Sequence, residues 1–212
     1  MIGALLYVSC CTKPDSIVFA VNKLAKFPNN PGITHNHQAV LHLIGYITNT
    51  AHKQIKCFSN YKEYPIFKTL MENNIHINEN TIGTFTDSSW NDCVDRGRST
   101  GGHCTIVQGG PVDHSSHLPI PVAMSSSEVE YIDTATACMR ASHLHMLTYN
   151  LRHLGTPEYD GDNIKCQPAR IIKDNEATII MSKYNKDTVG NRHVTRRFHY
   201  VRQDTVLSEH KF

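Results

Sequence analysis

The amino-acid sequence predicts an α/β fold in which an antiparallel meander of strands leads into parallel strands. Three observations predict this class. Polar and apolar residues alternate at His103–Gln108, as they do in a half-buried strand. Ser125 and Glu128 have the spacing of a capping box and open a long helix. Arg170–Lys173 is typical of a short strand, and it is followed by Asp174 and a further helix.

Residues 1–50 predict a helical segment. Asp15 is expected to cap a helix over Ser16–Phe27, whose apolar residues recur at helical spacing. The sequence Asn-Asn-Pro-Gly at Asn29–Gly32 then predicts a break between this helix and the next one. A second amphipathic helix is predicted over roughly His35–Ile47, so the two helices are expected to form a hairpin.

Residues 51–80 are mixed and polar, and we interpret them as a connector with one weak strand pattern at Ile55–Phe58. Strand patterns become clearer beyond this connector. The first predicted strand is Ile82–Asp87, a polar loop covers Asn91–Gly102, and a third strand is expected at Ile120–Met124.

Residues 81–212 are therefore expected to form the larger segment, in the order three strands, helix, strand, helix, helix. The long helix is predicted to run through about Leu151, and the next one covers Asn175–Tyr184. A last, basic helix is predicted over roughly Arg192–Asp204.

Composition excludes several classes of protein. The 212 residues are 40% hydrophobic and 19% charged, which argues against disorder and permits a sizeable core. The longest apolar run, around Ile2–Cys11, is too short to span a bilayer, and no basic stretch precedes it. A net charge of +2 means that any basic surface must be local. Seven cysteines without a C-x-x-C pair suit the reduced thiols of an intracellular protein.

Three acids occupy chemically suggestive places. Asp87 ends the first predicted strand, Glu130 lies one turn into the long helix, and Asp174 follows the later strand. Strand ends share one rim of an α/β sheet, and clustered carboxylates require cations to neutralise them. Oxygen ligands without His or Cys favour Mg²⁺ or Mn²⁺ over zinc, and two such ions about 4 Å apart can hydrolyse a phosphodiester. Spacing alone leaves open the alternative that these are solvated surface acids and caps.

Blocks of sequence resemble the ribonuclease H domain at the end of a copia-type LTR-retrotransposon polyprotein. In order, the blocks are Thr86–Trp90, Arg98–Gly102, Ser125–Tyr131 and Lys173–Ala177. Three earlier blocks resemble the stretch that joins reverse transcriptase to that domain: Gly3–Tyr7, Thr12–Asp15 and Ala20–Asn22. The segment His193–Tyr200 resembles the final basic helix of the family.

The resemblance implies an RNase H-like mixed sheet flanked by helices, lacking its last strand and preceded by an N-terminal helical hairpin. It implies cleavage of the RNA strand of an RNA–DNA hybrid with Mg²⁺ or Mn²⁺. Asp87 matches the first catalytic acid, Glu130 the helical glutamate and Asp174 the third acid, while Glu128 serves the helix cap. The expected partners are the hybrid and the rest of the polyprotein, including its reverse transcriptase. A membrane is not among the expected partners.

The sequence also departs from the family. A fourth acid is expected after a fifth strand, but the late acids Asp204 and Glu209 do not match its motif, and Phe212 falls about where that strand should begin. Loss of a metal ligand is expected to reduce turnover severely, so the alternative is an inactive retroelement remnant that binds nucleic acid or a protein. Asp133, one turn after Glu130, could reach the metal rim, but a solvated position or one facing its own helix is the stronger prediction. No Tyr-x-Asp-Asp motif occurs, which excludes reverse transcription by this chain alone.

Candidate substrate contacts lie in two places. Ser88 and Ser89 can donate hydrogen bonds to a phosphate or a ribose 2′-hydroxyl. A run of basic residues suits phosphate contacts that do not read sequence, although such a run can also be a solvated face. Its members are Lys183, Lys186, Arg192, Arg196, Arg197 and Arg202. Trp90 is expected to pack in the core or at the rim, and a zinc module built from the fourteen histidines is a third hypothesis.

Overall fold

The structure is a computed structural model. It describes residues 2–11, 14–26, 32–53, 55–58, 60–63, 65–72, 82–93, 97–107, 109–118, 123–154, 169–183 and 201. The chain divides into two compact units, which are described separately. One comprises Met1–Lys56 with His114–His117, and the other comprises Cys57–Asp113 with Leu118–Phe212. Within the described ranges, every helix is too short or too polar to cross a membrane.

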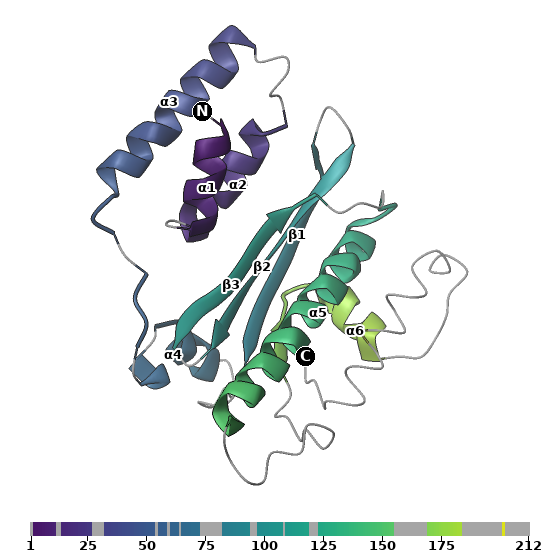
Figure 1. Ribbon diagram of the computed structural model, residues 1–212. Helices are drawn as coiled ribbons and strands as arrows, with labels where there is room; N and C mark the ends of the chain where they lie inside the picture. The colour runs from purple at the N-terminus through teal and green to yellow at the C-terminus, as the bar shows by residue number, and fades with distance from the viewer. Residues whose placement is uncertain are drawn as a thin grey trace. The chain divides into compact units, whose positions relative to one another are not determined.

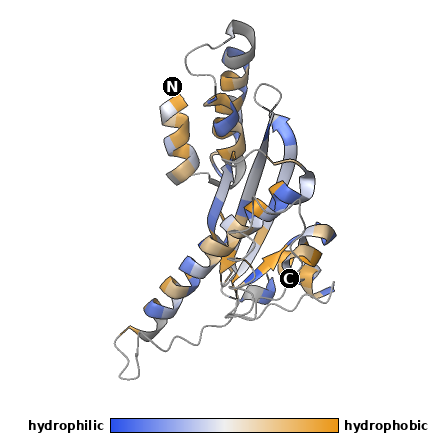
Figure 2. Ribbon diagram, turned by 90° about the vertical axis from the view of Figure 1, so that its right-hand side faces the viewer, coloured by the Kyte–Doolittle hydropathy of each residue, from blue (hydrophilic) through white to orange (hydrophobic). Residues whose placement is uncertain are grey.

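The first unit contains three helices: α1 (Ile2–Cys11), α2 (Pro14–Leu24) and α3 (Ile33–Asn49) (Figure 1). Their apolar faces share a small core made of Leu5, Ile17, Val21, Leu24, Val40 and Leu43. The two predicted helices are present, but Asp15 lies inside α2 because that helix already begins at Pro14, a residue well suited to a first turn. The helix α1 was not predicted, because it is apolar along most of its length and lacks an amphipathic period (Figure 2).

The second unit is built on a mixed four-stranded sheet with the strand order β3-β2-β1-β4. Its strands are β1 (Gly83–Cys93), β2 (Arg98–Val107), β3 (Gly110–His117) and β4 (Arg170–Ile172), of which the last four residues of β3 are counted with the first unit. The strand β1 pairs antiparallel with β2 and parallel with β4. The predicted mixed sheet flanked by helices is therefore confirmed.

Two predictions about the meander are wrong. The expected loop Asn91–Gly102 is mostly strand, because β1 continues to Cys93 and β2 already begins at Arg98. The third strand of the sheet is β3; of the expected strand Ile120–Met124, residues 120–122 lie outside the described part, and residues 123 and 124 are not in a strand. The strand β3 was not predicted, because its polar composition gives no alternation of polar and apolar residues.

Polar side chains that pair across neighbouring strands explain how strands with polar sequences can form this sheet. Asp113 in β3 has an oxygen 3.1 Å from Nε2 of the buried His103 in β2. Between β1 and β2, the hydroxyl groups of the buried residues Thr84 and Thr105 are 3.0 Å apart. Paired polar groups inside a sheet avoid the desolvation cost that unpaired ones would carry.

The sheet carries apolar residues on both faces. On one face lies the long helix α5 (Ser126–His153), with α6 (Glu176–Lys183) beside it, and Tyr131 and Ile171 are fully buried there (Figure 1). Ile172 belongs to a separate cluster with Phe67 and Leu70. Because successive strand residues point to opposite faces, this second cluster lies on the face away from α5.

That second cluster depends on a helix that the sequence did not predict. Phe67 and Leu70 lie on α4 (Pro65–Glu72), which follows the 3₁₀ turn Tyr61–Glu63. The strand expected at Ile55–Phe58 is wrong, since these residues adopt no regular structure. Of the predicted last helix, Val201 alone is described; it is helical and fully buried in the core on the α5 side.

The predicted cap of α5 is present. Ser125 Oγ accepts a hydrogen bond from the backbone N–H of Glu128 at 3.2 Å, and Glu128 Oε2 accepts one from the N–H of Met124 at 2.7 Å. Ser125→Ala is therefore expected to lower the free energy of unfolding by about 1 kcal/mol. Urea unfolding checks this, with Ser126→Ala as the control for an exposed serine that caps nothing. Equal losses in the two variants would contradict the assigned cap.

Candidate metal centre

Strand pairing brings two acids to the same rim of the sheet. In the parallel pair of β1 and β4, Phe85 lies opposite Ile172. Asp87 and Asp174 each lie two residues beyond this pair, so both leave the paired region in the same direction. The helix α5 presents Glu130 from its second turn, where it packs against β1 and β4.

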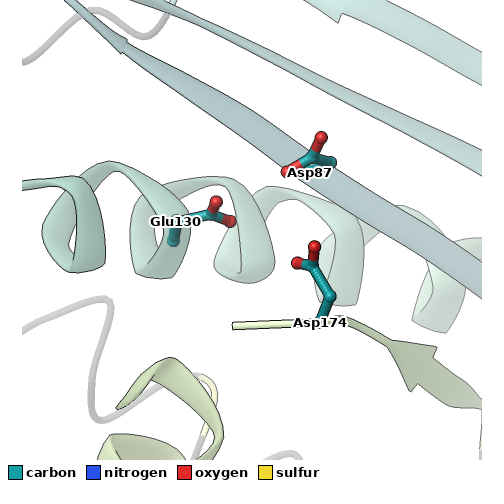
Figure 3. Close-up of side chains that lie close together, drawn as sticks. All are labelled: Asp87, Glu130 and Asp174. Carbon is teal, nitrogen blue, oxygen red and sulfur yellow. The ribbon is translucent and has the colours of Figure 1, made fainter. Parts of the chain in front are cut away.

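The three carboxyl groups converge, as the close-up in Figure 3 shows. Asp87, Glu130 and Asp174 each offer one oxygen, and these oxygens all lie within 4.8 Å of one another. Asp87 and Asp174 are exposed, whereas Glu130 is buried with 6% of its surface accessible. The cluster is therefore open to solvent at the two aspartates and closed behind the glutamate.

A lysine that the sequence analysis did not single out completes the cluster. The ammonium group of Lys173 contacts Glu130 Oε2, and the exposed fractions of the two side chains are 0% and 8%. Lys173 directly precedes Asp174, so one short stretch after β4 delivers both a carboxylate and a buried cation. No sequence pattern predicts this contact, because it depends on how α5 packs against the end of β4.

Burial raises the pKa of the Glu130 carboxyl group above its ordinary value. The hydrogen bond and the positive charge of Lys173 act in the opposite direction on this pKa, as does the nearby Ser88 hydroxyl, while the charge of Asp87 raises it further. By hydrogen-bond geometry, Ser88 Oγ is a buried atom without a partner among the described residues. Glu130 is thus the acid in the cluster whose charge is costliest to maintain.

The raised pKa of Glu130 predicts how metal binding depends on pH. A protonated carboxyl group is a poor cation ligand, so protons and metal compete for Glu130. The affinity for Mn²⁺ is expected to fall as the pH is lowered through the raised pKa of Glu130. This fall is expected at a higher pH than in a site whose glutamate is exposed and has an ordinary pKa. Mn²⁺ titrations followed by electron paramagnetic resonance at a series of pH values measure this. A fall confined to the range of ordinary carboxylates would contradict the prediction.

The donor set fits a hard divalent cation. Three carboxylates held this close repel one another unless positive charge is supplied, and a single lysine supplies one unit. Oxygen donors without nitrogen or sulfur suit Mg²⁺ or Mn²⁺, which keep several waters when bound. Ser88 Oγ adds a buried polar atom beside the cluster that is unpartnered among the described side chains. Among the residues that the structure describes, these three acids form the one carboxylate group of this kind.

The structure places the predicted substrate contacts only in part. Ser88 is half-buried, and its backbone N–H donates to Asp87 Oδ1 at 2.8 Å, while Ser89 is exposed. Lys183 is the last residue of α6, but its side chain lies outside the described part of the structure, together with Lys186, Arg192, Arg196, Arg197 and Arg202. Trp90 lies at the rim, 51% exposed, and its indole N–H donates to the carbonyl of Ala123 at 3.3 Å.

The expected position of Asp133 is wrong. Asp133 is neither solvated nor directed along its own helix: it is 2% exposed and its side chain packs against Gly101 of β2. A Cβ atom at position 101 would lie 1.7 Å from Asp133 Oδ2, so only glycine leaves room for this carboxylate. The block Arg98–Gly102, part of the family resemblance, thus includes a glycine that supports the helix carrying Glu130.

Comparison with known proteins gives two related sequences and a weakly similar structure. The chain is 26% identical over 202 residues to the retrovirus-related Pol polyprotein from transposon TNT 1-94 of Nicotiana tabacum; this covers 95% of the chain and 13% of the polyprotein. It is 28% identical over 147 residues to the secreted RxLR effector protein 161 of Plasmopara viticola, covering 69% of the chain and 90% of the effector. The crystal structure of RNase H1 from Halobacterium salinarum NRC-1 shares 14% identity, with a TM-score of 0.40 over 59% of the chain and 77% of that protein. No family model matches.

The relationship to the polyprotein extends over both units of the chain, although the chain spans only 13% of the polyprotein's length. It agrees with the family resemblance carried by the sequence blocks around Asp87, Glu130 and Asp174. The sheet order and the parallel pairing of β1 with β4 agree with the fold that the resemblance implies. The chain is thus similar in sequence to a retrotransposon Pol polyprotein over nearly its whole length, and its mixed sheet flanked by helices agrees with the RNase H-like fold that the resemblance implies.

Proposed function

We propose that the chain is an RNase H-type endonuclease domain that cleaves the RNA strand of RNA–DNA hybrids by hydrolysis that depends on Mg²⁺ or Mn²⁺. The convergence of Asp87, Glu130 and Asp174 within 4.8 Å carries this proposal. Three residues far apart in sequence meet at one rim, and each matches an acid that the family resemblance predicts to be catalytic. In a polyprotein, this activity would accompany a reverse transcriptase that lies in another part of the polyprotein.

Each residue of the cluster has a separate role in the proposed reaction. Bound divalent cations would supply activation of the attacking water and stabilisation of the leaving oxygen. The exposed carboxylates of Asp87 and Asp174 would hold the cations where a nucleic-acid backbone can reach them from solvent. Glu130, buried and tethered by Lys173, would provide the fixed inner ligand. Ser88 and Ser89, next to Asp87 in β1, would orient the scissile strand through its phosphate or 2′-hydroxyl.

A cleavage assay tests the proposal. The purified chain is incubated with Mg²⁺ and an RNA–DNA hybrid labelled on its RNA strand, alongside duplex DNA and single-stranded RNA. We expect cleavage of the RNA in the hybrid, lost when EDTA removes the metal. Asp87→Asn is expected to reduce the rate by at least about a hundredfold, because it removes a ligand while preserving shape.

The matched control is Glu176→Gln, which removes one exposed negative charge in the first turn of α6, outside the carboxylate cluster. Its rate is expected to stay close to that of the unmodified chain. Failure of the unmodified chain to cleave the hybrid, or equal rates with and without Asp87, would refute the nuclease proposal.

One observation favours the alternative of a remnant that binds without cleaving. The chain covers 90% of a relative named as a secreted effector, so a protein of this kind exists apart from a polymerase. Fluorescence anisotropy with the same labelled hybrid distinguishes the two functions. Tight hybrid binding without turnover, unchanged by Asp87→Asn, would favour the remnant.

A further inference from the structure

Lys173, the cation already buried in the cluster, has so far been given only the role of tethering Glu130. Its side chain is 0% exposed, so its ammonium group has lost its hydration shell and depends on protein oxygens for compensation. It contacts Glu130, one of the three oxygen donors that converge at the rim. The same carboxylate group therefore serves as the counter-charge of a lysine and as a candidate ligand of a metal ion.

We propose that Lys173 is a built-in counter-cation that holds Glu130 when no divalent ion is bound, and that it sets the concentration of Mg²⁺ or Mn²⁺ at which the centre fills. The inference rests on the proposed metal-dependent function and adds a positioning residue to it. Asp87 and Asp174, which are exposed, remain open to an arriving cation. Glu130 becomes a full ligand only when the metal shares its carboxylate group with the ammonium group or displaces that group.

Electrostatics gives the direction of the effect. All three ligand oxygens lie within 4.8 Å of one another, and the ammonium group contacts Oε2 of Glu130, so a cation among these oxygens lies only a few ångströms from a positive charge. Repulsion at that range in a partly buried site opposes metal binding, and removal of the charge is expected to raise the affinity by about tenfold or more. The lysine thus stabilises the metal-free cluster and weakens metal binding.

Neutral and charged replacements of Lys173 test the inference by direct binding measurements without substrate. Mn²⁺ is titrated into the full, EDTA-treated chain and followed by electron paramagnetic resonance and by isothermal titration calorimetry. Lys173→Met removes the charge and keeps an unbranched side chain one atom shorter, and Lys173→Gln removes the charge while still offering a hydrogen-bond donor to Glu130. We expect both to bind Mn²⁺ about tenfold or more tightly than the unmodified chain. Lys173→Arg keeps the charge and is expected to bind with near-unmodified affinity.

A control and a second neutral variant make the outcomes distinct. Lys68→Met removes one charge from an exposed lysine of α4 and is expected to leave the affinity unchanged. Should Lys173→Met fail to fold, Lys173→Gln gives the same comparison. Equal or weaker binding by the folded neutral variants would overturn the role of Lys173 while leaving the nuclease proposal intact. Absence of Mn²⁺ binding to every variant, including the unmodified chain, would overturn both.

Discussion

Glu130→Ala is expected to destabilise the metal-free protein by about 3 kcal/mol or more, because it leaves the ammonium group of Lys173 buried without the carboxylate that it contacts. Urea unfolding in EDTA measures this loss. In a chain that already carries Lys173→Met, Glu130→Ala is expected to cost much less stability, because the buried charge is gone. Together the single and double variants form a double-mutant cycle, from which we expect a coupling energy between the two side chains of about 1–3 kcal/mol.

The control for this cycle is Glu63→Ala, which removes an exposed acid from the 3₁₀ turn and is expected to change stability by less than about 0.5 kcal/mol. If Glu130→Ala cost the same with and without Lys173, the two side chains would not be coupled. The contact between them would then contribute nothing to the stability of the fold.

Gly101→Ala is expected to lower the free energy of unfolding by about 1–3 kcal/mol through overpacking. The added Cβ would lie 1.7 Å from Asp133 Oδ2 and 2.2 Å from its Cγ, so the buried Asp133 must move. Since Asp133 is one turn after Glu130 on α5, the displacement is also expected to weaken Mn²⁺ binding. Thermal and urea unfolding of the variant measure the first effect, and Mn²⁺ titration measures the second.

Two comparisons sharpen this prediction. Combining Gly101→Ala with Asp133→Ala removes all three atoms nearest to the new Cβ and is expected to recover part of the lost stability. Gly45→Ala, in the interior of α3 with no atom within 4 Å of the added Cβ, is expected to stabilise by about 0.5–1 kcal/mol through helix propensity. A stable Gly101→Ala variant with unchanged metal binding would show that Asp133 moves aside without consequence.

Local signals in the sequence were sufficient for the elements that carry the acids. The capping residues Ser125 and Glu128 fixed the start of α5, and a three-residue strand before Asp174 was visible as Arg170–Lys173. The elements that were missed lack a periodic signal. Helix α1 is apolar on every side, α4 is only eight residues long, and β3 is polar and is built around the contact between Asp113 and His103.

The residues of the candidate site also fall into those that the sequence could predict and those that it could not. Asp87, Glu130 and Asp174 could be proposed from sequence because each lies at a recognisable point of an element and in a block that resembles the family. Lys173 and the contact between Gly101 and Asp133 could not be predicted. Both depend on how α5 packs against β2 and the end of β4, and neither spacing nor composition encodes that distance.

The central claim is that Asp87, Glu130 and Asp174 together hold divalent metal, and anomalous diffraction from a crystal grown with Mn²⁺ tests it most directly. We expect a manganese peak among the three carboxylates, with an oxygen of each side chain within about 2.5 Å of a bound ion. The claim would be contradicted if manganese bound only elsewhere on the chain. It would also be contradicted if the cluster stayed free of metal at saturating Mn²⁺, with Lys173 still in contact with Glu130.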